Sequence, residues 1–209
     1  MTRSRTLRTR WLLAAVAAIV SLAGCAPLLL GGAVVGGSMI ATDRRSSATQ
    51  LEDQVIEVKA GNRTREVIGE RGRVSPTSYN RIVLLTGDVV TEADKAAVDQ
   101  AVARVDNVKS VVNELVVMGS LSLGSRTNDA LISTKVKASI VDTKDLYANS
   151  IKVVTERGVV YLMGRVSEKE ATQAANVARG VAGVVKVVKV FEVLTDAELA
   201  ELQSKPAQK

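Results

Sequence analysis

The sequence predicts an α+β protein made of two tandem domains, each with the element order α-β-β-α-β and a three-stranded mixed sheet covered by two helices. The main observation is an internal repeat, because Ile82 to Val117 and Gly158 to Val193 share one pattern of strand, helix and valine-rich strand. β-branched runs favour strands, and alanines that recur at helical spacing favour the helix between them. The repeat distance of 76 to 77 residues exceeds that of common solenoid units, which favours two small globular domains.

The second copy defines its elements most clearly. Val159 to Met163 is a β-branched and aromatic run that predicts a strand ending at Gly164. Ser167 is suited to cap the following helix, because acidic residues occupy the first turn and interact favourably with the helix dipole. Val184 to Val193 is too β-branched for a helix and predicts the final strand. By the same alignment, Gly87 closes the equivalent strand of the first copy.

Residues 1–24 have the features of a bacterial lipoprotein signal. Four arginines precede an apolar segment from Trp11 to Leu22, which is short for a membrane span, and Leu22-Ala23-Gly24-Cys25 matches the lipobox. Cys25 is therefore the predicted lipid attachment site. An ordinary secretory signal with an incidental cysteine is the alternative. Cys25 is the only cysteine of the chain, so no internal disulfide can form.

Residues 25–48 connect the predicted anchor to the folded part. Ala26 to Ala41 is apolar, glycine-rich and uncharged, which fits either a flexible tether or a glycine-zipper helix against the membrane. Its four glycines and its 16 residues favour the tether. Ala26 follows Cys25 at the position where an aspartate signals inner-membrane retention in enterobacterial lipoproteins. This favours lipid anchorage on the periplasmic face of the outer membrane.

The first domain is predicted over residues 49–118. Its first helix should begin near Gln50 and lose definition at Gly61-Asn62, with four apolar residues on or near the buried face: Leu51, Val55, Ile56 and Val58. A strand should follow from Arg73 to Tyr79, but Ser75-Pro76 interrupts it and indicates a sheet edge or a bulge. Tyr79-Asn80-Arg81 is the predicted turn into the next strand.

A short glycine- and serine-rich linker, residues 119–126, joins the two copies and cannot let them separate far. We therefore expect the domains to pack against each other. The second domain is predicted over residues 127–195, where Asn128-Asp129 caps a helix from Ala130 to about Val141. Three residues of this helix should face the sheet: Ile132, Val136 and Ile140. The tail, residues 196–209, begins with a short helical pattern.

Catalysis, metal binding and nucleotide binding have little support in the composition. The chain has no histidine, which removes the commonest general base and metal ligand. Its single cysteine is assigned to lipidation, so thiol chemistry and thiolate metal sites are excluded as well. Gly31-Gly32 and Gly36-Gly37 neither follow a strand nor open a capped helix, so they do not form a phosphate-binding loop. We expect no enzyme, metal or cofactor; paired carboxylates remain the enzymatic alternative.

Charge separates the two copies. The whole chain carries a net charge of +6, but four of its 28 basic residues precede Cys25, so the mature protein carries +2. This modest charge argues against nucleic acid as a partner. Residues 50–117 carry a net charge of −2, whereas residues 125–195 carry +4. A basic domain on a lipid anchor is attracted to anionic headgroups by about 1 kcal/mol for each well-placed Lys or Arg.

The residues also resemble a known family. A strand ending in Leu-x-Gly, an acidic-capped alanine-rich helix and Val-x-Gly-Val before a valine-rich strand are similar to the BON domain. Two such domains behind a lipoprotein signal resemble the DolP/YraP family of outer-membrane lipoproteins. Shorter matches support this resemblance: Thr42-Asp43-Arg44-Arg45-Ser46, Asn128-Asp129, Thr134-Lys135-Val136 and Val154-Thr155-Glu156. The resemblance covers nearly all of the chain after Cys25.

The resemblance implies that the second domain binds anionic phospholipid, such as phosphatidylglycerol or cardiolipin, and that the protein supports envelope integrity, including at the division site. The implied contacts lie on the first helix of that domain and just before it: Gly124, Asn128, Leu131, Thr134, Lys135, Lys137 and Ala138. Leu131 stands where the family can carry an aromatic side chain; its alternative role is burial against the first domain. A different class of function also remains open, a protein-interaction module: either Val184 to Val193 offers a sheet edge for strand addition, or the exposed helix binds an outer-membrane assembly or cell-wall partner protein.

Overall fold

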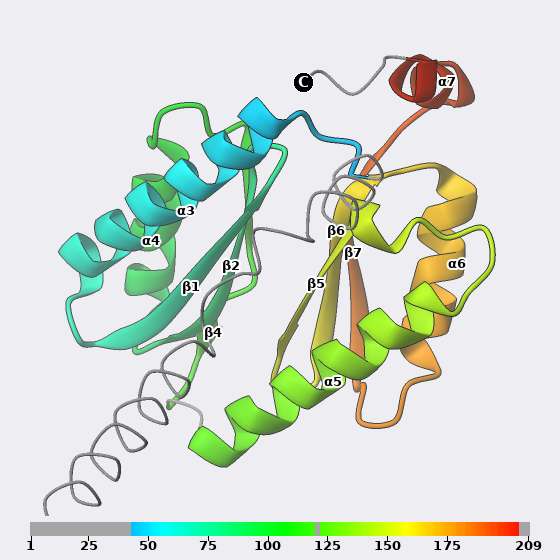
Figure 1. The fold of residues 1–209 in the computed structure, drawn as a ribbon. Coiled ribbons are helices and arrows are strands. Elements are labelled where there is room, and N and C mark those ends of the chain that lie inside the picture. The colour runs from blue at the N-terminus through cyan, green and yellow to red at the C-terminus, as the bar shows by residue number, and fades with distance from the viewer. Residues whose placement is uncertain (1–42, 120–121, 205–209) are drawn as a thin grey trace, which may run out of the picture. The chain divides into compact units, whose positions relative to one another are not determined.

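The computed structural model describes residues 43–119 and 122–204, and these residues belong to one compact unit. The predicted signal segment, the lipid attachment site at Cys25, the apolar stretch to Ala41 and the end of the tail lie outside the described residues. Within them, the same order of helices and strands occurs twice (Figure 1).

The first domain contains α3 (Ser47–Ile68), β1 (Gly72–Tyr79), β2 (Ile82–Val89), α4 (Glu92–Ala103), β3 (Ser110–Asn113) and β4 (Val116–Val117). β1 is antiparallel to β2, while β3 and β4 are both parallel to β2 and share the third position of the sheet. Pro76 lies in β1 at the sheet edge, as predicted. Asn80 and Arg81 both have positive φ, as in a type I′ turn, which confirms the predicted hairpin.

The second domain contains α5 (Leu123–Val141), the 3-10 turn η2 (Ala148–Ser150), β5 (Ile151–Glu156), β6 (Val159–Val166), α6 (Glu168–Arg179) and β7 (Lys186–Val193), and α7 (Asp196–Ser204) follows it. Its sheet has the order β5-β6-β7, with β5 antiparallel and β7 parallel to β6. Ser167 caps α6 in a complete capping box with Glu170, which confirms the predicted N-cap. The predicted α+β class, with two mixed sheets each packed against helices, is also confirmed.

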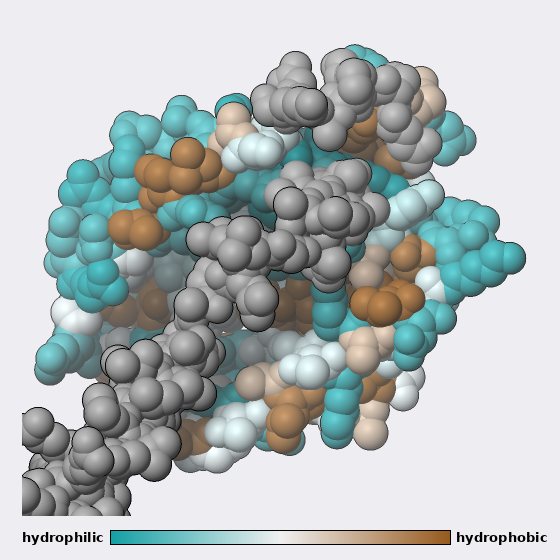
Figure 2. Space-filling model, viewed as in Figure 1, coloured by the Kyte–Doolittle hydropathy of each residue, from teal (hydrophilic) through white to brown (hydrophobic). Residues whose placement is uncertain are grey.

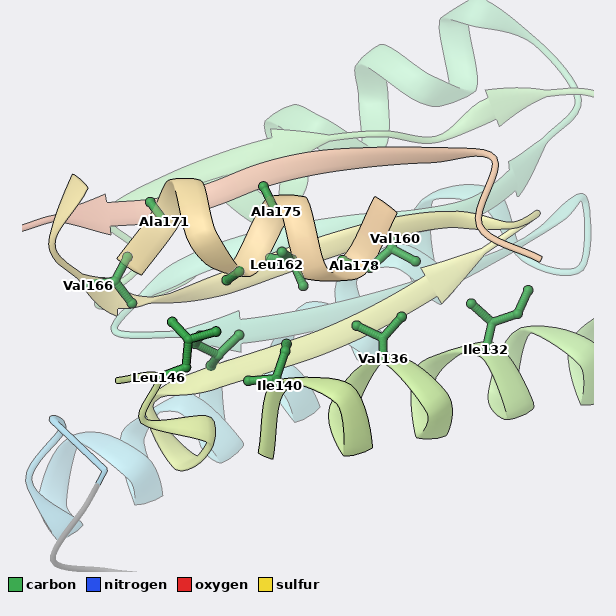
Figure 3. Packing of buried hydrophobic residues seen from close by; sticks show 12 residues of the cluster. Ile132, Val136, Ile140, Leu146, Val160, Leu162, Val166, Ala171, Ala175 and Ala178 are labelled. Atoms are coloured by element: carbon green, nitrogen blue, oxygen red, sulfur yellow. The ribbon is translucent and has the colours of Figure 1, made fainter. Parts of the chain in front are cut away.

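Each domain has its own core between its sheet and its two helices. In the second domain, Ile132, Val136 and Ile140 of α5 pack on the sheet as predicted, in one cluster with the alanines of α6 (Figure 3). Alanine side chains are small, so α6 approaches the strands closely. The equivalent core of the first domain consists of buried residues from α3, β2, α4 and the last strands: Ile56, Ala60, Ile68, Val83, Leu85, Val89, Val98, Val102 and Leu115.

The two sheets bury their second faces in a third apolar cluster that joins the domains. It contains Tyr79 and Leu84 of the first domain together with Tyr161, Met163 and Val190 of the second. Successive residues of a strand face opposite sides of the sheet, so β2 and β6 are buried both by their helices and by residues of the other sheet. The expected packing between the domains is therefore present.

α3 differs from its prediction in length and in its buried face. It begins at Ser47 and continues through Gly61-Asn62 to Ile68. Its buried residues follow each other at intervals of three or four: Asp53, Ile56, Ala60, Thr64 and Ile68. Of the four residues predicted to be buried, only Ile56 is, while Leu51, Val55 and Val58 are 62%, 45% and 64% exposed. That prediction was wrong because the buried stripe contains polar and small residues, which hide its helical period.

Gly87 and Gly164 do not close their strands, contrary to the sequence prediction, because β2 and β6 each continue for two more residues. A Cβ at Gly87 would lie 1.9 Å from the backbone oxygen of Arg73, and one at Gly164 would lie 2.4 Å from that of Ser150. Both glycines are therefore required for close approach of the neighbouring chain. Gly87 also has a φ of +120°, which L side chains rarely adopt.

Candidate functional site

The helix that carries the predicted lipid-binding residues starts earlier than expected. The side chain of Ser122 accepts the N–H of Ser125 and caps α5, so the helix includes residues that were assigned to the linker. The predicted cap at Asn128-Asp129 is therefore wrong. Asp129 is instead buried and accepts the N–H groups of Arg157 and Gly158, at 2.9 and 2.8 Å, in the turn between β5 and β6.

The first domain repeats this arrangement. Asp53 of α3 accepts the N–H groups of Asn80 and Arg81, both at 2.8 Å, and the hydroxyl of Ser78 at 2.7 Å. Burial on its own would raise the pKa of Asp53, but the hydrogen bonds from Ser78 and from the turn outweigh burial and lower the pKa. In each domain, a buried aspartate thus fastens the first helix to the hairpin.

The exposed side of α5 brings together six of the seven predicted contact residues: Gly124, Asn128, Leu131, Thr134, Lys135 and Ala138. Leu131 is 54% exposed, so the alternative in which it is buried against the first domain is wrong. Two further apolar residues, Leu123 and Val141, are 78% and 61% exposed at the ends of the helix. We call these eight residues the α5 face. Hydrophobic side chains over α5 are visible in Figure 2.

Lys137, the seventh predicted contact residue, lies apart from the α5 face. Its ammonium donates to the backbone oxygen of Ile151 at 2.8 Å and to that of Ala148, and so fastens α5 to η2 and β5. Burial lowers the pKa of Lys137. Lys135, by contrast, is exposed, and its ammonium has no partner among the described residues. Lys135 is the lysine of this pair that faces outward.

A groove of about 790 Å³ runs beside the α5 face. Its walls come from α5, from β5 and from Arg45 and Tyr79 of the first domain. The Arg45 guanidinium lies 3.9 Å from the centre of the Tyr79 ring, and the Tyr79 hydroxyl donates to a backbone oxygen of η2 at 3.1 Å. Burial raises the pKa of Tyr79 well above its usual range, so the hydroxyl stays protonated. Sequence reasoning missed these two residues because they reach the groove from the other domain.

An exposed helix face of this kind is suited to binding. Within the described ranges, 43–119 and 122–204, no group of three side chains is arranged to hold a metal ion. No helix in the same part of the chain is long and apolar enough to cross a membrane. Exposed leucines and valines on one side of a helix can enter the interfacial region of a bilayer, while a nearby lysine meets the headgroups.

Comparisons with known proteins agree with the repeat. A model of the BON domain matches the chain twice, over residues 49–119 and 128–195. The outer membrane lipoprotein DolP of Haemophilus influenzae is 35% identical over 163 residues, which cover 77% of this chain and 84% of that protein.

Two further relatives match smaller shares. The 21 kDa hemolysin of Actinobacillus pleuropneumoniae is 34% identical and covers 66% of this chain and 73% of that protein. Osmotically-inducible protein Y of Escherichia coli is 40% identical over 60 residues, which are 28% of this chain and 30% of that protein. The two matched regions cover all of the two α-β-β-α-β units except the first residues of α3 and α5, and the chain therefore belongs to the BON-domain family.

Proposed function

We propose that this protein is a non-enzymatic outer-membrane lipoprotein that binds anionic phospholipid through the α5 face and supports the integrity of the cell envelope, including at the division site. The observation that carries the proposal is Leu131, which is 54% exposed on a helix whose opposite side is fully packed in the core. If Leu131 were buried, the proposal would lose its main support.

The surroundings of Leu131 favour an anionic membrane. Lys135 lies one helical turn away on the same exposed side, and each lysine placed near an anionic surface contributes about 1 kcal/mol. The domain that carries α5 has a net charge of +4, whereas the first domain has −2. Insertion of Leu131 into the membrane interface is therefore supported by electrostatic attraction between this domain and the anionic headgroups.

The proposed anchor is Cys25, and it acts separately from the α5 face. A diacyl or triacyl cysteine gives stable membrane attachment, because each buried methylene contributes about 0.8 kcal/mol. A relative with 35% identity is named an outer membrane lipoprotein, which supports an outer-membrane location for this chain. The α5 face then selects among lipids at a membrane to which the protein is already attached.

Co-sedimentation of residues 40–209 with vesicles tests the proposal, because these residues lack Cys25. Vesicles of phosphatidylcholine alone are compared with vesicles that also contain phosphatidylglycerol or cardiolipin. We expect binding only with anionic lipid, and a loss of at least about tenfold in affinity for Leu131→Glu, since a charge at the interface opposes insertion. Val55→Glu is the matched control, because Val55 is 45% exposed at the equivalent place in α3. Equal binding to both kinds of vesicle would contradict the proposal.

A second candidate function is the addition of a strand from a partner protein to β7. The observation that favours it is a difference between sheet edges. At β1, Pro76 lacks an N–H, Glu57 accepts the N–H of Ser78, and Lys152 donates to the oxygen of Ser78. At β7, no side chain of the described residues forms such hydrogen bonds with the backbone of the edge.

A photo-crosslinker at Val185, which is 79% exposed beside β7, tests this candidate in cells. Strand addition predicts one protein partner, captured in stoichiometric amount, and no capture from Met118, which is 54% exposed next to β4. Equal capture from both positions, or none, would contradict it.

A further inference from the structure

Two consecutive arginines, Arg44 and Arg45, extend into different domains at the first described residues of the chain. Arg44 binds Glu170 of α6 through two hydrogen bonds of 2.6 and 2.8 Å, and donates to the backbone oxygen of Arg165 at 2.7 Å. The guanidinium of Arg165 returns a hydrogen bond to the oxygen of Arg44 at 3.3 Å. Arg44 also lies over the ring of Tyr147, at 5.2 Å from its centre. All of these partners belong to the second domain.

Arg45 makes its contacts with the first domain and with its own neighbour. It donates to Asp53 of α3 at 2.8 Å and forms two hydrogen bonds with Asp43, at 2.8 and 3.2 Å. Its guanidinium lies over Tyr79 of β1. The side chains of Arg44 and Arg45 are only 9% and 13% exposed, so both ion pairs are largely removed from water.

Each arginine binds a carboxylate that already organises its domain. Glu170 completes the capping box of α6, in which it accepts the N–H of Ser167 at 2.8 Å. Asp53 fastens α3 to the β1–β2 hairpin. A short peptide, Asp43 to Arg45, therefore connects the start of α6 to the hairpin of the other domain. The pair of Arg44 with Glu170 is bidentate and has strict geometry, so it fixes orientation as well as distance, while Arg45 binds Asp53 through one hydrogen bond.

The same peptide lies next to the proposed lipid-binding surface. Arg45 lines the same groove as Thr134, Ala138 and Val141 of the α5 face. The 17 residues between Cys25 and Asp43 can span at most roughly 60 Å. A lipid anchor at Cys25 therefore acts on the folded part at Asp43, next to the groove beside the α5 face.

We propose that Asp43, Arg44 and Arg45 form a clasp that locks the two domains together and presents the α5 face to the membrane that holds the anchor. Arg44 and Arg45 are positioning residues in this proposal, since they touch no lipid. The presentation of the α5 face rests on the proposed function, whereas the locking of the domains does not. Without the clasp, the anchor would pull on α3 alone, and the second domain would be held by the sheet contacts, the link before α5 and the other ion pairs between the domains, such as Lys152 with Glu57.

The locking of the domains is tested by distances between spin labels in residues 40–209, which contain no native cysteine. Labels at Gln100→Cys in α4 and Thr172→Cys in α6 report on one exposed site in each domain. We expect one narrow distance distribution in the parent, and a distribution at least twice as broad in Arg44→Gln and in Glu170→Gln. Arg63→Gln is the control, because it breaks an exposed ion pair within α3. Circular dichroism establishes that each variant is folded, and Arg45→Gln gives a second test if one variant is not.

The presentation of the α5 face is tested with an environment-sensitive fluorophore at Asn128→Cys. Residues 40–209 are attached to vesicles with 20% phosphatidylglycerol through an N-terminal hexahistidine tag and a nickel-chelating lipid. We expect the attached parent to show a blue shift, and attached Arg44→Gln to show less than half of it. Without the tag, the two proteins should bind these vesicles equally, because the α5 face is intact in both.

The outcomes separate the two proposals. An unchanged spin-label distribution in folded Arg44→Gln and Arg45→Gln would overturn the clasp. A broad distribution with an unchanged blue shift would overturn its role at the membrane. Failure of the untagged parent to bind anionic vesicles would refute the proposed function instead, and the spin labels would still decide whether the clasp locks the domains.

Discussion

The first helices of the two domains, α3 and α5, are alike where they are buried and different where they are exposed. Asp53 of α3 and Asp129 of α5 lie 76 residues apart in sequence, and each binds the hairpin turn of its own domain. Val55 and Leu131 also correspond at this distance, and both are exposed. The comparison shows that the buried side of the helix maintains the fold, while the exposed side is free to take on separate roles.

The exposed sides differ mainly in charge. Around Val55, the acidic residues Glu52 and Glu57 are engaged with Arg81 and Lys152. Around Leu131, Lys135 has no partner among the described residues. The same fold therefore presents a helix whose residues Glu52 and Glu57 are neutralised by cations outside it, and a second helix whose Lys135 has no partner among the described residues.

The largest expected effect concerns the equivalent glycines Gly87 and Gly164. Gly87→Ala should reduce the free energy of unfolding by at least about 3 kcal/mol, because the new Cβ would meet a backbone oxygen and the positive φ would be strained. Gly164→Ala should cost less, since its φ is not positive and the predicted contact is longer. Urea unfolding of residues 40–209 measures both. Equal losses of stability in the two variants would show that the positive φ of Gly87 adds nothing to the effect of the steric clash.

The next effect concerns the paired aspartates. Asp53→Ala and Asp129→Ala should each reduce the free energy of unfolding by about 2 to 4 kcal/mol, because both leave two N–H groups of a partly buried turn without an acceptor. Asp53→Ala should be the more damaging, since it also leaves the largely buried Arg45 without one of its carboxylates. Urea unfolding with Arg45→Gln added to each variant checks the reason: the second substitution should cost less in Asp53→Ala than in Asp129→Ala, because only the contacts of Arg45 with Asp43 and Tyr79 remain to be lost. A full additional loss there would refute the coupling.

A smaller effect should distinguish the exposed lysines. Lys135→Gln should weaken binding to vesicles with phosphatidylglycerol by about 1 kcal/mol, roughly fivefold, and should reduce the salt dependence of binding. Lys59→Gln should change neither, because Lys59 lies on α3 and is paired with Asp106 at 2.9 Å. Titration with vesicles at two salt concentrations makes the comparison. Equal losses for the two variants would mean that net charge, rather than the α5 face, governs attraction.

The smallest effect is a difference in the response to acid. Burial raises the pKa of Glu156, although Arg73 opposes this effect. The contribution of Glu156 to stability therefore grows as the pH falls through its folded pKa towards the unfolded value near 4.3. The pKa of Asp53 is lowered, so its contribution is complete above the unfolded value near 3.9 and is lost at lower pH. Urea unfolding between pH 7 and 3 should show a gain of under about 1 kcal/mol before the acid loss. Glu156→Gln should abolish this gain in stability and leave the acid loss unchanged. If the gain persisted in this variant, it would have to come from another group.

The sequence allowed the fold class to be predicted because the repeat preserves hydrophobic period and strand composition in both copies. The buried side of α5 was predictable for the same reason, since Ile132, Val136 and Ile140 are large and apolar. The buried side of α3 was not, because Ala60 and Thr64 stand where α5 has Val136 and Ile140. Asp53 is recognised as buried only through its partners in the β1–β2 hairpin, which are distant in sequence. Lys137 was grouped with Lys135 because spacing alone does not show that its ammonium binds backbone oxygens.

The clasp was beyond sequence reasoning as well. Arg44 and Arg45 are adjacent, but their carboxylates belong to Glu170 and Asp53, which are separated by more than half of the chain. A local pattern of two arginines does not reveal partners at such a distance. Side-chain direction, which depends on the completed fold, decides which domain each arginine meets.

Because the two sheets pack against each other, the two domains should stay together even when the chain between them is cut. A protease cut between Val117 and Ser122 would leave two fragments that still share the cluster around Leu84 and Met163 and the ion pairs of Arg44 and Lys152. Such a nicked protein should remain a single particle in solution. Either fragment produced alone would instead expose an apolar sheet face to water, so it should aggregate or capture the missing half when the two are mixed.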